Sequence, residues 1–158
     1  MIFCHEWTQI TDGSVELIQL KPDLSAPAGS PQLLFHASEA QWGKNLKDLG
    51  KDAVGFVTDG PFLYRTKTGK LLIIWSSFGS SDYAVGIAES TSGKVTGPWR
   101  QQSEPLFKAD GGHAMIFRTF QGQLMLCLHQ PNKRQTERMK LFPLEDVGTT
   151  LRISAVEK

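Results

Sequence analysis

Short apolar runs bounded by turn residues recur along the chain, and residues 58–77 show the pattern most clearly. Leu63 and Tyr64 begin a short strand-like run that ends at Arg65, residues 71–75 form an apolar run, and the polar segment 66–70 between them contains Gly69. Runs of this length around a glycine-containing turn predict two antiparallel strands joined as a β-hairpin.

The same pattern returns later in the chain. Residues 112–130 align without a gap on residues 59–77, a shift of 53 residues that places Arg118 on Arg65 and Gly122 on Gly69. A repeat of this length built from β-type units is typical of propeller blades. We therefore predict an all-β chain that forms part of a β-propeller with antiparallel four-stranded blades.

The remaining apolar runs divide this single domain into three units, an incomplete blade over residues 1–54 and blades over 55–110 and 111–158. Residues 37–54 interrupt the first unit and, with two glycines, are expected to form a loop. Further strands are expected at residues 15–20, 32–36, 83–88, 104–107, 138–144 and 151–154.

The first unit is predicted to lack its first strand. Residues 1–6 align with residues 72–77 and 125–130, which are second strands of hairpins. A closed propeller typically needs at least four blades. We therefore expect the chain to be the C-terminal part of a longer protein. The open edge at residues 1–7 would be covered by the missing part or by self-association.

Composition excludes several classes of partner. The formal net charge is +1 and charged residues make up 21% of the chain, so a basic surface for nucleic acid is not expected. No apolar run is long enough to span a membrane. The N-terminal residues lack the features of a signal peptide, and the compartment stays open. Cys4 and Cys127 are expected to be buried thiols rather than a disulfide framework.

Candidate site residues follow from hairpin geometry, because the first strand of a hairpin begins where the second strand ends. Polar and aromatic residues at these ends predict a pocket at the propeller axis. The alternative is that strand ends are polar because they meet solvent. The residues expected at this mouth are Asp59, Ser76, Ser77 and Phe78 of the second unit, His113, His129 and Gln130 of the third, and His5, Glu6 and Trp7 of the first.

Aromatic and basic residues extend this candidate site. Trp7, Trp42 and Phe78 are predicted to offer aromatic surfaces on which the rings of a ligand can stack, whereas Trp75 and Trp99 are expected in the core. Glycines beside His113 allow close approach of the backbone. Arg138 is expected either to bind substrate hydroxyls or to form a surface ion pair with Glu137.

Four short motifs in register with the blades carry a family resemblance. They are His5-Glu6-Trp7, residues 58–63, Gly97-Pro98-Trp99 and residues 111–115. In this order they resemble glycoside hydrolase family 43, the five-bladed β-propeller arabinofuranosidases, xylosidases and arabinanases. The resemblance implies the last three of five blades and an inverting hydrolase acting on arabinose- or xylose-containing plant polysaccharides or oligosaccharides. It also implies a base Asp, a second Asp that tunes a pKa, and an acid Glu.

The resemblance leaves the acid role open between Glu6 and Asp59. Asp59 stands where the family usually has its acid Glu, and Glu6 is favoured because its side chain reaches further. Asp59 would then orient or tune a neighbouring group. His113 is expected near the axis, where it would help to hold a calcium ion or ordered water.

The base and the usual pKa-tuning Asp would precede Met1, so this chain alone is expected to be inactive or impaired. The alternative function is a carbohydrate-binding propeller module that has lost its chemistry.

Overall fold

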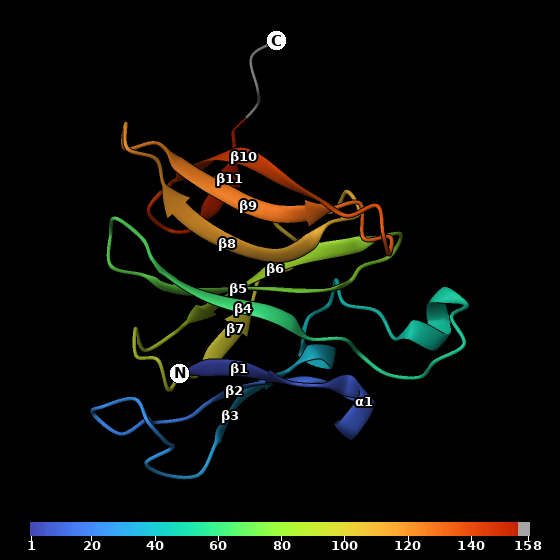
Figure 1. The fold of residues 1–158 in the computed structure, drawn as a ribbon, viewed down its shortest axis with the longest axis horizontal. Coiled ribbons are helices and arrows are strands. Elements are labelled where there is room, and N and C mark those ends of the chain that lie inside the picture. Colours follow the sequence, from blue (N-terminus) through green and yellow to red (C-terminus); the bar gives the residue numbers. More distant parts are fainter. Residues whose placement is uncertain (155–158) are drawn as a thin grey trace.

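The computed structural model describes residues 1–154, which form three antiparallel sheets stacked on one another (Figure 1). The prediction of an all-β chain is confirmed. The strands of the first sheet are β1 (Ile2–His5), β2 (Ser14–Leu17) and β3 (Gln32–His36). Those of the second are β4 (Asp59–Arg65), β5 (Leu71–Phe78), β6 (Tyr83–Ser90) and β7 (Trp99–Gln101). Those of the third are β8 (Gly112–Arg118), β9 (Leu124–Gln130), β10 (Arg138–Asp146) and β11 (Leu151–Ile153).

The second sheet is buried on both faces because it lies between the other two. Alternate residues of β5 point to opposite sides, as the two-residue period of a strand requires. Leu72 and Ile74 pack in the core shared with the third sheet. Ile73 and Trp75 pack in the core shared with the first sheet. This explains why β5 reads as a continuous apolar run rather than an alternating one.

The repeat seen in the sequence is present in the strand pairing. Asp59 pairs with Ser76 across β4 and β5, and Gly112 pairs with His129 across β8 and β9. Both ladders have an irregularity directly after this first pair. The two irregularities occupy equivalent positions of the repeat, at the start of each first strand.

The outer strand of the second sheet differs from the expectation, and the structure also contains short helical segments. The outer strand of the second sheet is β7 rather than residues 104–107, which contain Pro105 and contribute only a bridge from Phe107 to Val85. A short helix, α1 (Trp7–Ile10), follows β1. The loop 37–54 contains the 3-10 turns Ala37–Glu39 and Leu46–Leu49, the second ended by Gly50 in the left-handed region.

The two outer sheets leave apolar surface exposed. Met115, Cys127 and Leu141 lie side by side across β8, β9 and β10 on the face opposite the core, and Met115 and Leu141 are about half exposed. Strand β1 is an edge strand of the first sheet among the described residues. None of the helices in residues 1–154 is long and apolar enough to cross a membrane.

The core predictions for Trp75 and Trp99 are confirmed, since both side chains are buried. Cys4 and Cys127 are free thiols of intermediate exposure, so the expectation of full burial is wrong for both. Cys127 lies on the open face of the third sheet, which explains its exposure.

Candidate functional site

Asp59 and His113 meet at the mouth, where β4 and β8 both begin. The Asp59 Oδ1 atom lies 2.9 Å from His113 Nδ1. The backbone N–H of His113 donates to Ser76 Oγ at 2.8 Å, which fixes β8 against the end of β5. Gly60 makes this approach feasible, because a Cβ atom there would lie 2.9 Å from the His113 Cα atom. The predicted juxtaposition of these residues is therefore present.

The second oxygen of Asp59 is held by Tyr83, the first residue of β6. The Tyr83 hydroxyl donates to Asp59 Oδ2 at 2.9 Å. Tyr83 is only 3% exposed, and burial followed by the charge of Asp59 raises its pKa well above the ordinary value. The phenol therefore stays protonated and donates at any physiological pH. A Cβ at Gly112 would overlap the Tyr83 ring, so the glycine makes room for the tyrosine.

Aromatic side chains surround Tyr83. The Phe78 ring meets the Tyr83 ring edge-on at 5.0 Å, and the His129 ring stacks on it at 5.8 Å. His129 Nε2 lies 3.0 Å from Asn132 Oδ1, so a second residue orients this imidazole. Trp7 packs against the same buried cluster as Phe78. The structure thus brings Phe78, His129 and Trp7 to one side of Asp59, as the hairpin geometry predicts.

Glu6 and Cys4 lie at the end of β1, in the adjoining sheet. The Glu6 side chain is exposed, and its carboxylate accepts no hydrogen bond from residues 1–154. Burial, then the charges of Asp59 and Glu6, raise the pKa of the Cys4 thiol to about 12. Both carboxylates also raise the pKa of Tyr83. Glu6 and Asp59 therefore act electrostatically on the same neighbours.

His5 belongs to a different contact. Its Nδ1 atom lies 3.1 Å from Glu16 Oε1, which also accepts from the Ser14 hydroxyl at 2.9 Å. The His5 carbonyl accepts from the Thr58 hydroxyl at 3.4 Å. The His5 ring is thus engaged within its own sheet rather than with Asp59.

Trp42 is placed away from this cluster. It is 6% exposed and packs on Trp75 with ring centres 4.9 Å apart. It rests directly above Gly86 of β6, where any larger residue would overlap the indole. Most of its surface therefore belongs to the core, which leaves only an edge for a ligand.

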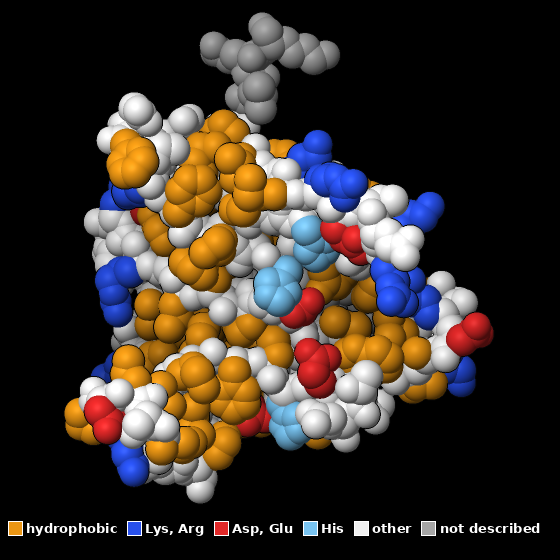
Figure 2. Space-filling model, in the orientation of Figure 1, with side chains coloured by type: hydrophobic (Ala, Val, Ile, Leu, Met, Phe, Trp, Pro, Cys, Tyr) orange, Lys and Arg blue, Asp and Glu red, His pale blue; other side chains and the backbone are white. Residues whose placement is uncertain are grey.

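Arg138 opens β10 next to the two mouth histidines. With His113, His129 and Met139 it lines an open hollow of about 330 Å³. Its guanidinium donates to the carbonyl of Glu137 at 2.7 Å, and no carboxylate pairs with it within residues 1–154. The expected surface ion pair with Glu137 is therefore replaced by a backbone contact. Figure 2 shows histidine and acidic side chains gathered in a row on this face, between apolar areas.

The described residues do not by themselves fit a calcium ion. Calcium takes six to eight oxygen ligands, whereas Asp59 Oδ2 accepts a hydrogen bond from the Tyr83 hydroxyl and Asp59 Oδ1 lies 2.9 Å from His113 Nδ1. Within residues 1–154 no group of three or more His, Cys, Asp or Glu side chains is arranged to hold a metal ion.

Tyr83 and Asn132 are the site residues that the sequence prediction missed. The strand-end argument covered first and second strands, and Tyr83 begins a third strand. Extending the argument to third strands selects Tyr83 in the second unit and Arg138 in the third. Asn132 follows β9 in a turn and has no counterpart in the repeat.

Neither a protein-family model nor a curated protein matches the chain. Solved structures do match. The chain is 45% identical to an endo-arabinase from Bacteroides thetaiotaomicron VPI-5482, with a TM-score of 0.84, over 91% of this chain and 50% of that one. A thermostable family-43 glycoside hydrolase shares the fold at 18% identity and a TM-score of 0.70, over 91% and 48%. So does an alpha-L-arabinofuranosidase from Lactobacillus brevis, at 14% identity and a TM-score of 0.69, over 98% and 53%.

The chain thus spans about half the length of the structures it matches. The predicted partial β-propeller is confirmed, since three antiparallel sheets of three or four strands superpose on these proteins. The half-length match agrees with the expectation that the chain corresponds to the C-terminal part of such a protein. The resemblance to glycoside hydrolase family 43, expected from the four motifs, is confirmed over nine-tenths of the chain.

Proposed function

We propose that this chain supplies the acid-bearing part of an inverting family 43-type glycosidase site for arabinose- or xylose-containing polysaccharides and oligosaccharides. The observation that carries the proposal is the contrast between two carboxylates at one mouth. Asp59 is fixed by Tyr83 and His113, whereas Glu6 is exposed and unbonded to any described residue.

Inverting hydrolysis requires two carboxyl groups with different roles. One must protonate the leaving oxygen, and the other must activate water about 6.5–9.5 Å away across the sugar. A carboxylate whose two oxygens each have a fixed neighbour suits an orienting role, whereas an exposed carboxyl group without such neighbours can approach the leaving oxygen of a substrate. We therefore assign the acid to Glu6, and we assign to Asp59 the positioning of His113 and the electrostatics of the pocket.

Substrate contacts would come from the residues around these carboxylates. His113, His129 and Arg138 line the hollow beside the mouth and offer donors to sugar hydroxyls. Phe78 and Trp7 offer aromatic surface on the Tyr83 side. The lining carries both apolar and hydrogen-bonding groups, which is the usual composition of a small-molecule site.

The general base is assigned to a carboxylate that is not among the site residues of this chain. The 158-residue chain alone is therefore proposed to turn over substrate slowly or not at all. One observation favours the second candidate, a carbohydrate-binding module without catalysis. Aspartate stands at position 59 where the family usually has glutamate, and both of its oxygens are already engaged. A bound but unreactive sugar would fit that arrangement.

The assignment of Glu6 as the acid can be tested in the longer protein to which this chain is proposed to belong. The test compares substrates whose leaving groups differ in their need for protonation. We expect Glu6→Gln to lower kcat/KM on arabinan by about 10²–10⁴-fold, the usual contribution of a general acid. The same variant should lose far less on a dinitrophenyl arabinofuranoside, whose leaving group needs no protonation. Glu145→Gln is the matched control, because this exposed glutamate pairs with Arg152 near the opposite end of β10.

Each remaining outcome is informative. An equal loss on both substrates would remove Glu6 from the acid role. Binding of arabino- or xylo-oligosaccharides by calorimetry without turnover of any substrate would support the module. If the protein neither binds these oligosaccharides nor turns over any substrate, both candidate functions are refuted.

A further inference from the structure

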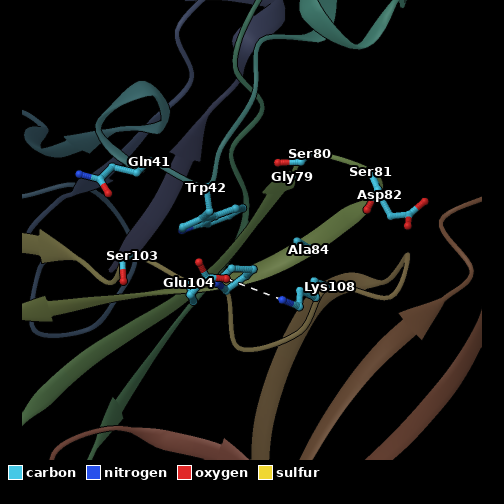
Figure 3. Close-up of a pocket in the computed structure, with 11 residues that line it drawn as sticks. Gln41, Trp42, Gly79, Ser80, Ser81, Asp82, Ala84, Ser103, Glu104 and Lys108 are labelled. Carbon is cyan, nitrogen blue, oxygen red and sulfur yellow. Dashed lines mark ion pairs between the residues drawn. The ribbon is translucent and has the colours of Figure 1, made fainter.

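A cavity among the described residues lies beside the edge of Trp42, across the turn 80–82 from the surroundings of Tyr83. It has a volume of about 630 Å³, within the range of small-molecule sites. Figure 3 shows Trp42 at its centre, with the turn 80–82 on one side and Gln41 and Ser103 on the other. Glu104 and Lys108 close the remaining side.

Each wall of this cavity is fixed by backbone hydrogen bonds. The segment with Trp42 is tied to β5 by the Lys44 N–H, which donates to the Phe78 carbonyl at 2.9 Å. The turn after β5 is closed by the Gly79 N–H, which donates to the Asp82 carbonyl at 2.8 Å. Glu104 and Lys108 are held through Phe107, whose backbone bonds reciprocally to Val85 at 2.9 and 3.2 Å. A ligand would therefore meet a preformed site rather than order three loops.

The lining suits a neutral ligand rich in hydroxyl groups. Asp82 and Glu104 supply acceptors, Lys108 and Gln41 supply donors, and the edge of Trp42 supplies an apolar surface. Glu104 and Lys108 are 79% and 74% exposed and only 3.7 Å apart, so their mutual pairing leaves both able to bond a ligand. An anion would meet two carboxylates, and a cation would meet Lys108. A sugar hydroxyl can donate to the first group and accept from the second.

The cavity is also next to the proposed catalytic face. Its wall residues Ser80, Ser81 and Asp82 line a second hollow of about 410 Å³, which contains Phe78, Tyr83 and Asn132. The turn between β5 and β6 is therefore shared by this cavity and the surroundings of Asp59. A glycan chain that crosses this turn would contact both.

We propose that the Trp42 cavity is a second carbohydrate-binding site, which holds a neutral oligosaccharide portion of the polysaccharide whose cleavage is proposed above. It increases affinity for long substrates and takes no part in bond cleavage. The inference rests on the proposed function for the identity of the sugar, and on the cavity alone for the existence of the site.

The test uses calorimetric titration of the full-length protein with arabinohexaose and xylohexaose. Asp82→Ala/Glu104→Ala removes the two acceptors, and Ser103→Trp fills the cavity from its exposed rim. Glu145→Ala is the matched control on a distant strand. We expect the first two variants to weaken hexasaccharide binding at least tenfold and to raise KM on polysaccharide, with kcat on a nitrophenyl arabinofuranoside unchanged. The control should leave all three values unchanged.

The outcomes separate the two proposals. Hexasaccharide binding that is unchanged in both cavity variants would overturn the second site, whatever the enzyme's activity. Binding of a simple alkylammonium ion, lost in Asp82→Ala/Glu104→Ala and unaccompanied by sugar binding, would overturn it in favour of a cation site. Sugar binding that depends on the cavity in a protein that cleaves nothing would refute the glycosidase and leave the second site standing.

Discussion

Replacing Tyr83 by phenylalanine removes one oxygen atom and the hydrogen bond that it donates to Asp59 at 2.9 Å. Hydrogen bonds to charged groups contribute about 1.5–3 kcal/mol. Asp59 is 34% exposed and keeps His113 as a partner, so solvent screening reduces this value. We expect the free energy of unfolding to fall by about 1–2 kcal/mol, or roughly 2–8 °C in Tm for a domain of this size.

A double-mutant cycle isolates the contact. Tyr83→Phe, Asp59→Ala and the double variant are unfolded in urea and compared with the wild type. We expect a coupling free energy of about 1 kcal/mol, whereas independent sites add to within about 0.3–0.5 kcal/mol. Tyr64→Phe is the control, because it removes a similar bond to Asp146 at 3.0 Å far from the mouth. Additive effects of Tyr83 and Asp59 would refute the proposed clamp.

Alkaline pH gives an independent measurement of the same contact. The pKa of Tyr83 is raised in the folded protein, so the stability it confers is present below about pH 10 and is lost as pH rises further. The chain has two tyrosines, so the ionisation of each can be followed by absorbance near 295 nm in a variant that lacks the other. We expect the wild type to lose stability more steeply above pH 10 than Tyr83→Phe. Equal slopes would contradict the reasoning.

Three further expectations can be checked in the 158-residue chain. Burial acts to raise the pKa of Asp146, but the backbone N–H groups of Gly148 and Lys67 and a tyrosine hydroxyl lower it overall. Asp146→Asn should therefore cost about 1 kcal/mol of unfolding free energy at pH 7, a difference that disappears as pH falls below about 4. Cys4, with a pKa of about 12, should resist iodoacetamide at pH 8 until the protein is unfolded, as mass spectrometry would show. The exposed face around Leu141 should cause self-association measurable by light scattering, and Leu141→Lys should reduce it; a monomeric wild type would contradict this.

Much of the fold could be predicted because the blade repeat is visible in short stretches of sequence, as apolar runs separated by turns. The shift that aligns residues 59–77 with 112–130 places Gly112 on Asp59 and His129 on Ser76, and in the structure these residues form equivalent pairs, Asp59 with Ser76 and Gly112 with His129. Hairpin geometry then places carboxylates and histidines at one end. These inferences need only the alternation of strands and the positions of turn glycines, and both are local properties of the sequence.

The errors concern long-range packing. Trp42 reads as a surface aromatic in a polar loop, but Gly86, 44 positions later, provides a flat backbone on which the indole can lie. Tyr83 reads as an ordinary strand residue, although its hydroxyl has a partner 24 positions earlier. Neither contact leaves a local signature, because Asp59 and Tyr83 begin strands that flank β5 in one sheet, and Trp42 reaches Gly86 from a loop of the preceding unit.

The two mouth carboxylates differ because they come from different parts of neighbouring blades. Asp59 opens a first strand just before a bulge, where β6 and β8 both approach it and supply Tyr83 and His113. Glu6 follows a second strand and lies at the start of a short helix, where its side chain faces solvent. A carboxylate with fixed neighbours keeps its direction, whereas one without a hydrogen-bond partner among residues 1–154 can move toward a bound ligand. One structural repeat therefore gives these two carboxylates different surroundings, because neighbouring blades contribute different strand ends to the same mouth.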